Sequence, residues 1–159
     1  YEMLRSLVGS EMCIRDRNLT GHNPLSTPEG AAHSLFDTPF VPMTGAYSNY
    51  LTTFAREAAA EVGVECSEGT YVGMLGPSFE TDAEVKALGI LGADYVGCST
   101  VCEAIMARAL KMQVLGLTLV TNKAGAADNS HEAELAAGNA AADDTTGVLL
   151  GVLHRLGGL

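Results

Sequence analysis

Three short stretches of the sequence carry residue types that suit the binding of a polar small molecule. They read GPSFET (residues 76–81), GCST (97–100) and TNKAG (121–125), and they combine small residues with hydroxyl, amide or carboxylate groups. Small residues allow a ligand to approach the backbone, and Glu80 supplies the one carboxylate among the three stretches. Ser99 and Thr100 come directly before an expected helix, whose first N–H groups and positive dipole end can bind an anion. A capped turn without a ligand is the competing interpretation of each stretch.

Each of these stretches lies at or directly after the end of an expected strand. The strands are predicted at residues 70–76, 93–99 and 113–122, and helices are predicted at 48–63, 81–91 and 100–112. A last helix toward Leu156 is expected to be capped by Asn129 together with Glu132, as Thr81 and Glu84 cap the second helix. Alternating strands and helices indicate an α/β/α architecture, in which ligands bind beyond the carboxyl ends of the strands.

Composition excludes several classes of function. The chain has 159 residues, 47% of them hydrophobic, and a net charge of −10. No apolar run reaches the roughly 18–20 residues of a membrane span, so no membrane partner is expected. No nucleic-acid partner is expected either, because the basic residues after Arg17 form no run or stripe; they are Arg56, Lys86, Arg108, Lys111, Lys123 and Arg155.

The cysteines and histidines do not predict a metal site. Cys98 and Cys102 have a C-x3-C spacing without a second Cys or His pair. We expect the four cysteines to be small buried apolar residues in a reducing, cytoplasmic setting.

Four segments together resemble the trimeric purine nucleoside phosphorylase family, from about Asn18 to the end of the chain. They are NLTGHNPL, EGTYVGMLGPSFET, LGADYVGCSTVCEAIMAR and TLVTNKAG. The resemblance implies a three-layer α/β/α nucleoside phosphorylase-like fold with a mixed central sheet. It also implies phosphorolysis of purine nucleosides to the free base and ribose 1-phosphate in purine salvage. Inorganic phosphate would be the co-substrate, with no metal or organic cofactor, and the complete protein would be a homotrimer.

The resemblance also assigns roles to individual residues. Asn122 matches the residue that hydrogen-bonds purine N7 and O6 during catalysis, and Glu80 matches the carboxylate that accepts the N1–H of a 6-oxopurine. Phe79 matches the aromatic wall of the base pocket, and Ser99 matches a phosphate ligand. The remaining matches are substrate-binding residues: His131 for the ribose 5′-hydroxyl, Cys98 beneath the ribose, and Phe36 closing a neighbouring subunit's site.

The sequence departs from the family pattern at several of these positions. Cys98 and Cys102 stand where the family has Met and Pro, Gly45 stands where it has Asp, and His131 follows Asn122 at a shorter spacing. For His131, a solvated neighbour of a helix cap is the alternative interpretation. The preference between hypoxanthine and guanine is left open.

Two other functions remain as alternatives. A methylthioadenosine phosphorylase carries Asp at the position of Asn122, because a carboxyl group suits a 6-amino purine. Asn122 therefore favours 6-oxopurine nucleosides. The second alternative is a non-catalytic purine-binding domain.

Residues 1–17, YEMLRSLVGSEMCIRDR, fit no targeting class, because acidic residues balance the arginines and no apolar run follows a basic start. They resemble the translation of one reading frame of a transposon-type sequencing-library adapter. We therefore expect residues 1–17 to be an artefact outside the fold, and residues 18–159 to be the C-terminal part of one phosphorylase domain, incomplete at its N-terminus. The family's Gly-rich phosphate loop, its Arg-x-His-x-Tyr-like stretch and its Asn-Ala-Ala-Gly-type loop are not found. We expect the chain as given to be inactive.

Resequencing the genomic DNA upstream of the Asn18 codon, with a different library chemistry, tests this interpretation. We expect the new sequence to continue into a Gly-rich phosphate loop and an Asn-Ala-Ala-Gly-type loop. A sequence that again encodes residues 1–17 would contradict the adapter origin and would favour the purine-binding alternative.

Overall fold

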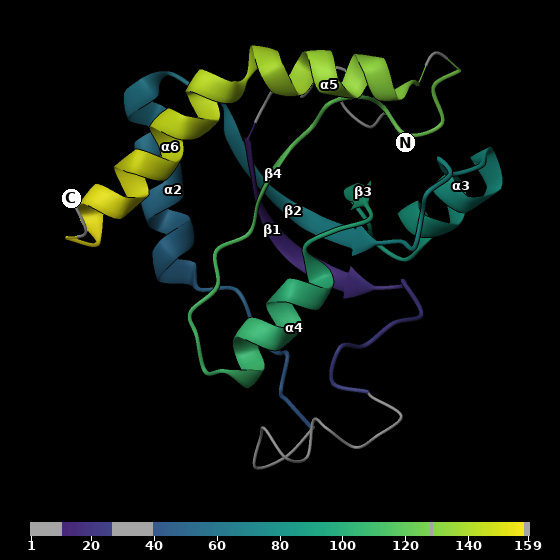
Figure 1. Cartoon of the computed structure of the whole chain (residues 1–159), viewed down its shortest axis with the longest axis horizontal. Helices are drawn as coiled ribbons and strands as arrows, with labels where there is room; N and C mark the ends of the chain where they lie inside the picture. Colours follow the sequence, from purple (N-terminus) through teal and green to yellow (C-terminus); the bar gives the residue numbers. More distant parts are fainter. Residues whose placement is uncertain (1–10, 27–39, 128, 158–159) are drawn as a thin grey trace.

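The computed structural model describes residues 11–26, 40–127 and 129–157, and a small mixed sheet lies at its centre (Figure 1). The strand order is β3-β2-β1-β4. Strands β1 (Glu11–Asn18), β2 (Cys66–Gly73) and β3 (Tyr95–Gly97) are parallel, whereas β4 (Leu117–Leu119) is antiparallel to β1. The described residues thus confirm an α/β fold with a mixed sheet.

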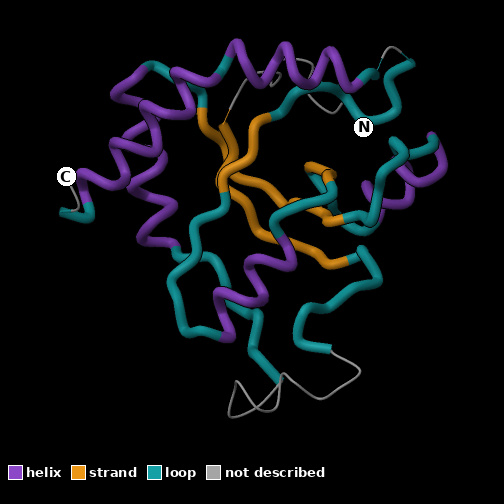
Figure 2. Tube along the Cα trace, viewed as in Figure 1, coloured by secondary structure: helices purple, strands orange, loops and turns teal. Residues whose placement is uncertain are grey.

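Helices cover both faces of the sheet and pack on separate clusters of buried side chains. Helices α2 (Asn49–Val62) and α6 (Ala142–Arg155) share one cluster, which contacts Cys66 of β2 and Leu117 of β4. Helix α4 (Val101–Ala109) packs on the other face, in a cluster that contains Tyr71 of β2. Successive strand residues point to opposite faces, so β2 contributes Cys66 to one cluster and Tyr71 to the other. Figure 2 shows the strands between these helices.

Helix ends are where the local sequence predicts the structure best. The Ser48 hydroxyl accepts a hydrogen bond from the Leu51 N–H at the start of α2, and Gly63 ends this helix at φ 76°, a backbone conformation that favours glycine. Helix α3 (Asp82–Ile90) begins with the expected capping box between Thr81 and Glu84. The helix predictions for α2, α3 and α4 are confirmed.

The last helix differs from the prediction in two ways. It is divided at the buried Ala141 into α5 (His131–Ala140) and α6. The cap residue is Ser130, whose hydroxyl accepts from the Ala133 N–H at 3.2 Å. Asn129 precedes the cap residue, and its side-chain Nδ2 donates to the Lys123 carbonyl in the preceding loop.

Residues 11–17 depart from the expectation that 1–17 lie outside the fold. They form most of β1, which pairs along its whole length with β2 and at Glu11–Cys13 with β4. The pairing is made by main-chain groups, which every non-proline residue carries, so a segment of any origin can form it. Residues 1–10 lie outside the described residues, and the adapter origin stays a prediction.

Among the described residues, no helix is both long and apolar enough to cross a membrane. The longest are α2 and α6, each of 14 residues, and they pack against each other. Arg155 of α6 reinforces this contact with ion pairs to Glu57 at 3.3 Å and Glu61 at 2.6 Å on α2.

Replacement of Gly151 by Ala is expected to destabilise the chain by about 1–3 kcal/mol. A Cβ at Gly151 would lie 2.6 Å from the Ala58 Cβ, so α6 would have to move away from α2. The matched control is Gly138→Ala in α5, where an added Cβ meets nothing within 4 Å. The control should gain up to about 1 kcal/mol, because alanine is the better helix former. Urea unfolding of the three proteins measures both changes, and equal stabilisation by both substitutions would contradict the close packing.

Candidate functional site

Two of the three candidate stretches lie side by side at the carboxyl ends of neighbouring parallel strands. The Met74 N–H donates to the Gly97 carbonyl at 2.8 Å, which extends the pairing of β2 and β3 beyond the strands. An added Cβ at Gly76 would lie 3.4 Å from the Cys98 Cβ. The 76–81 and 97–100 stretches are therefore in contact.

The third stretch reaches this region by another route. Strand β4 is antiparallel to β1, and its last residue, Leu119, pairs with Glu11 at the start of β1. The carboxyl end of β4 therefore lies at the opposite end of the sheet from the carboxyl ends of β2 and β3, so the rule for parallel strands does not place residues 121–125. The chain then returns, and a Cβ at Gly125 would lie 3.5 Å from the Asp82 Oδ1 and 3.6 Å from the Val85 Cγ2.

This contact brings the 121–125 loop against the first turn of α3, directly after the 76–81 stretch. Glu80 and Asn122 are both half-buried, and Phe79 is 44% exposed. The Thr121 hydroxyl donates to the Asn122 Oδ1 at 2.7 Å. This bond orients the amide, so that the donor nitrogen Nδ2 is on the side away from Thr121.

Ser99 is exposed and is held by hydrogen bonds around its own backbone. Its N–H donates to the phenol oxygen of Tyr71 at 3.2 Å, and its hydroxyl lies 3.0 Å from the hydroxyl of Thr100. Thr100 has φ 76° and its side chain does not cap α4. The usual side-chain cap is therefore missing at the start of α4, where the first N–H of the helix, that of Val101, donates to the Ser99 carbonyl at 2.8 Å.

Tyr71 is the residue of this region that sequence reasoning missed. Its position in the β2 strand predicts only a buried aromatic side chain, and it is indeed only 3% exposed. The contact with Ser99 joins residues 28 positions apart, and no spacing in the sequence indicates it.

One predicted site residue, His131, is not brought to this region by any contact among the described residues. His131 begins α5 with its side chain 77% exposed, and its Nδ1 lies 3.6 Å from the Glu134 carboxylate on the same helix. This geometry fits the alternative of a solvated neighbour of the cap, and a ribose contact stays a prediction. Phe36 lies outside the described residues.

The expectation of small buried cysteines is wrong for the three cysteines whose side chains are described. Cys98 is exposed, and Cys66 and Cys102 are half-buried. Cys98 and Cys102 are free thiols. Within the described ranges, no group of three or more His, Cys, Asp or Glu side chains is placed to hold a metal ion.

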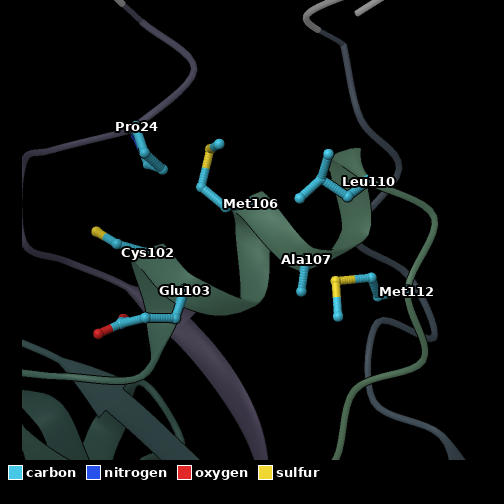
Figure 3. A pocket seen from close by; sticks show the side chains of 7 residues that line it. All are labelled: Pro24, Cys102, Glu103, Met106, Ala107, Leu110 and Met112. Atoms are coloured by element: carbon cyan, nitrogen blue, oxygen red, sulfur yellow. The ribbon is translucent and has the colours of Figure 1, made fainter.

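A separate groove of about 420 Å³ runs along the outer face of α4 (Figure 3). It contains none of the predicted site residues; its lining is Pro24, Cys102, Glu103, Met106, Ala107, Leu110 and Met112. The walls are almost entirely apolar, so the groove lacks the convergent polar groups expected of a site for a polar substrate.

The fold and the converging loops define an α/β protein whose candidate site lies beside the carboxyl ends of β2 and β3. The model of the phosphorylase superfamily matches residues 6–154, and the chain belongs to this family.

Similar proteins include the purine nucleoside phosphorylases of Mycobacterium tuberculosis and Rattus norvegicus. The first is 41% identical over 152 residues, covering 93% of this chain and 52% of the relative. The second is 41% identical over 146 residues, covering 85% of this chain and 50% of the relative. The chain thus spans about half the length of the curated relatives it matches.

Solved structures give the same result for the fold. The chain resembles Schistosoma purine nucleoside phosphorylase in complex with hypoxanthine, with a TM-score of 0.86 and 31% identity over 97% of this chain and 58% of that one. A complex of the Schistosoma protein with guanosine matches with the same TM-score and identity. The nucleoside phosphorylase-like fold expected from the sequence is confirmed.

Acidification is expected to weaken the capping box at the start of α3, the helix that follows the Glu80 loop, and so to lower the stability of the fold. Hydrogen bonds from the Thr81 N–H and hydroxyl, each 2.8 Å long, lower the pKa of the Glu84 carboxyl below its ordinary value of 4.5. Ionised Glu84 therefore stabilises the fold above that ordinary value, and the stabilisation is lost as the pH falls through the lowered pKa. Melting temperatures of the wild type and Glu84→Gln should differ most near neutral pH and converge in acid.

The variant Glu103→Gln, which removes a carboxylate from the first turn of α4, is the control for the loss of one charge at a helix start. A Glu84→Gln difference that is independent of pH, or equal to that of the control, would contradict the role of the charged capping box.

Proposed function

We propose that the complete protein catalyses phosphorolysis of 6-oxopurine nucleosides to the free purine and ribose 1-phosphate. The observation that carries the proposal is the convergence of the Glu80, Ser99 and Asn122 loops in a chain about 40% identical to purine nucleoside phosphorylases. The hypoxanthine and guanosine in the solved Schistosoma complexes support purine ligands.

In this reaction, a phosphate oxygen forms a bond to C1′ of the ribose while the bond from C1′ to purine N9 breaks. The electron pair of that bond passes into the purine, which leaves as an anion and takes up a proton from water at N7. Donors aimed at the developing negative charge lower the barrier. Asn122 Nδ2 is the donor in our proposal, because the Thr121 hydroxyl already binds the amide oxygen. Glu80 accepts the N1–H, which a 6-oxopurine has and a neutral 6-amino purine lacks.

Phosphate would bind at Ser99 and at the first turn of α4. The serine hydroxyl and the N–H groups of a helix start are both donors to an anion. Only such local donors can compensate for the net charge of −10, which disfavours anion binding overall. Phe79 would form the wall of the base pocket, and Cys98 would lie beneath the ribose.

The remaining parts of the proposal follow from the family. The complete protein is a homotrimer, with Phe36 closing a neighbouring subunit's site and His131 binding the ribose 5′-hydroxyl. It needs no organic cofactor or metal, and phosphate is the co-substrate. We place it in the cytoplasm, which agrees with the free thiols of Cys98 and Cys102. Asn122 argues against a methylthioadenosine phosphorylase, and the named relatives argue against a non-catalytic binding domain.

Calorimetric titration of the chain with hypoxanthine and with adenine tests the purine half of the proposal. Hypoxanthine should bind more tightly, and Asn122→Asp should weaken it by about tenfold or more, because a carboxylate cannot donate to O6 or N7. The control is Asn139→Asp, an exposed position of α5 that gains the same charge. Equal affinity for the two bases, or equal effects of the two substitutions, would contradict the proposal.

Turnover is tested with inosine and phosphate on the chain extended by its natural upstream sequence. Release of hypoxanthine is expected there. Purine binding without any phosphorolysis would instead support a binding domain.

A further inference from the structure

The phenol of Tyr71 reaches across the sheet from β2 to the backbone that carries Ser99. Tyr71 pairs with Tyr95 of β3, and its ring passes over Gly97, two residues further along that strand. A Cβ at Gly97 would overlap the Tyr71 hydroxyl, so only glycine at this position leaves room for the phenol. The buried ring thereby places its one polar atom directly beneath Ser99.

Hydrogen-bonding contacts link the Tyr71 phenol to Ser99, and Ser99 in turn to Thr100. The Ser99 N–H donates to the phenol oxygen at 3.2 Å, and the Ser99 hydroxyl lies 3.4 Å from the same oxygen. The Thr100 hydroxyl lies 3.0 Å from that of Ser99.

The three hydroxyls contribute three protons, and the two contacts between their oxygens use two of them. One hydroxyl proton therefore remains for an acceptor outside the group. When the phenol donates to the Ser99 hydroxyl, the remaining proton lies on Ser99, which is exposed, or on Thr100, which is half-buried.

The backbone around Thr100 is held in a strained conformation. Val101 N–H donates to the Ser99 carbonyl at 2.8 Å, which closes a three-residue turn centred on Thr100 at φ 76° and ψ −49°. This form of the γ-turn is rare, and positive φ is unfavourable for a β-branched residue. Such strain persists only where surrounding contacts enforce it. The Tyr71 phenol supplies such a contact, because it accepts the N–H of Ser99, the residue directly before Thr100.

We propose that Tyr71 is a positioning residue for phosphate: its phenol fixes the Ser99 backbone and directs the Ser99–Thr100 hydroxyls toward the anion. The inference rests on the proposed function, because it takes Ser99 as the phosphate ligand. It assigns no contact between Tyr71 and the substrate. Tyr71→Phe keeps the ring in the core and removes only the oxygen that holds Ser99.

Titration of the ¹⁵N-labelled chain with inorganic phosphate, followed by NMR at the Ser99 and Thr100 amides, tests this role. Tyr71→Phe should weaken phosphate binding by about five- to tenfold and leave hypoxanthine binding unchanged, since the base contacts come from the other two loops. The matched control is Tyr95→Phe, which removes a phenol lying 3.4 Å from another serine hydroxyl, that of Ser67, on the same pair of strands. This control should bind phosphate as the wild type does.

Repeating Tyr71→Phe in the Ser99→Ala protein shows whether Tyr71 affects phosphate binding through Ser99 or through a general change in the sheet. Because Tyr71 acts partly through the Ser99 hydroxyl, Tyr71→Phe should cost less phosphate affinity in the Ser99→Ala protein than in the wild type. Full additivity of the two losses would overturn the proposal. So would equal phosphate affinity of Tyr71→Phe and Tyr95→Phe.

Failure of the proposed function gives different results. A wild-type chain that binds hypoxanthine but shifts neither the Ser99 nor the Thr100 amide with phosphate would overturn the role of Tyr71 and leave the purine site standing. A wild-type chain that binds neither compound would reject the proposed function, and the role of Tyr71 with it.

Discussion

Strand β2 is the element on which the rest of the structure depends. Its main chain is hydrogen-bonded on both sides, to β1 and to β3, and its side chains alternate between the two buried clusters. Val72 is fully buried, and Tyr71 is 3% exposed. Both layers of helices are therefore held to the same strand, and the loop with Phe79 and Glu80 begins only a few residues after it ends. A shift of β2 by one residue would exchange the two faces and move the loop with them.

The candidate site is assembled by two different physical means. Main-chain pairing between β2 and β3 places the Glu80 and Ser99 loops together, because parallel strands end at the same edge. The Asn122 loop is not placed by strand direction, since β4 is antiparallel to its neighbour. It is placed by packing, with Val120 on the α4 cluster and Gly125 on the first turn of α3. The position of the Asn122 amide thus depends on the tertiary contacts of α3, and the position of the Ser99 and Thr100 hydroxyls depends on β2 and β3.

The polar groups of the site are oriented by neighbours that do not themselves face a ligand. Thr121 binds the oxygen of Asn122, and Tyr71 binds the backbone of Ser99. Each contact satisfies one hydrogen-bonding group of a candidate loop from within the protein. Donors that are oriented before the ligand arrives lose less entropy on binding, which is the physical advantage of such supporting contacts.

The sequence by itself determined what depends on neighbouring residues. Ser48, Gly63 and the Thr81–Glu84 pair predicted helix ends correctly, because a cap is made within one turn of the chain. The placement of the three candidate loops after strands was also predicted, because each combines small and polar residues there; their role as a binding site stays a prediction. The cap at Ser130 was missed by one residue, since Asn129 and Ser130 are both good caps and a contact of Asn129 with Lys123 decides between them.

Only the tertiary structure decided what depends on distant residues. The direction of β4, the entry of residues 11–17 into the sheet and the contact of Tyr71 with Ser99 all join segments far apart in the chain. Main-chain pairing is open to almost any residue, and a phenol in a strand has many potential partners. Such contacts are selected by how the whole chain packs, and no local pattern of residue types records the outcome.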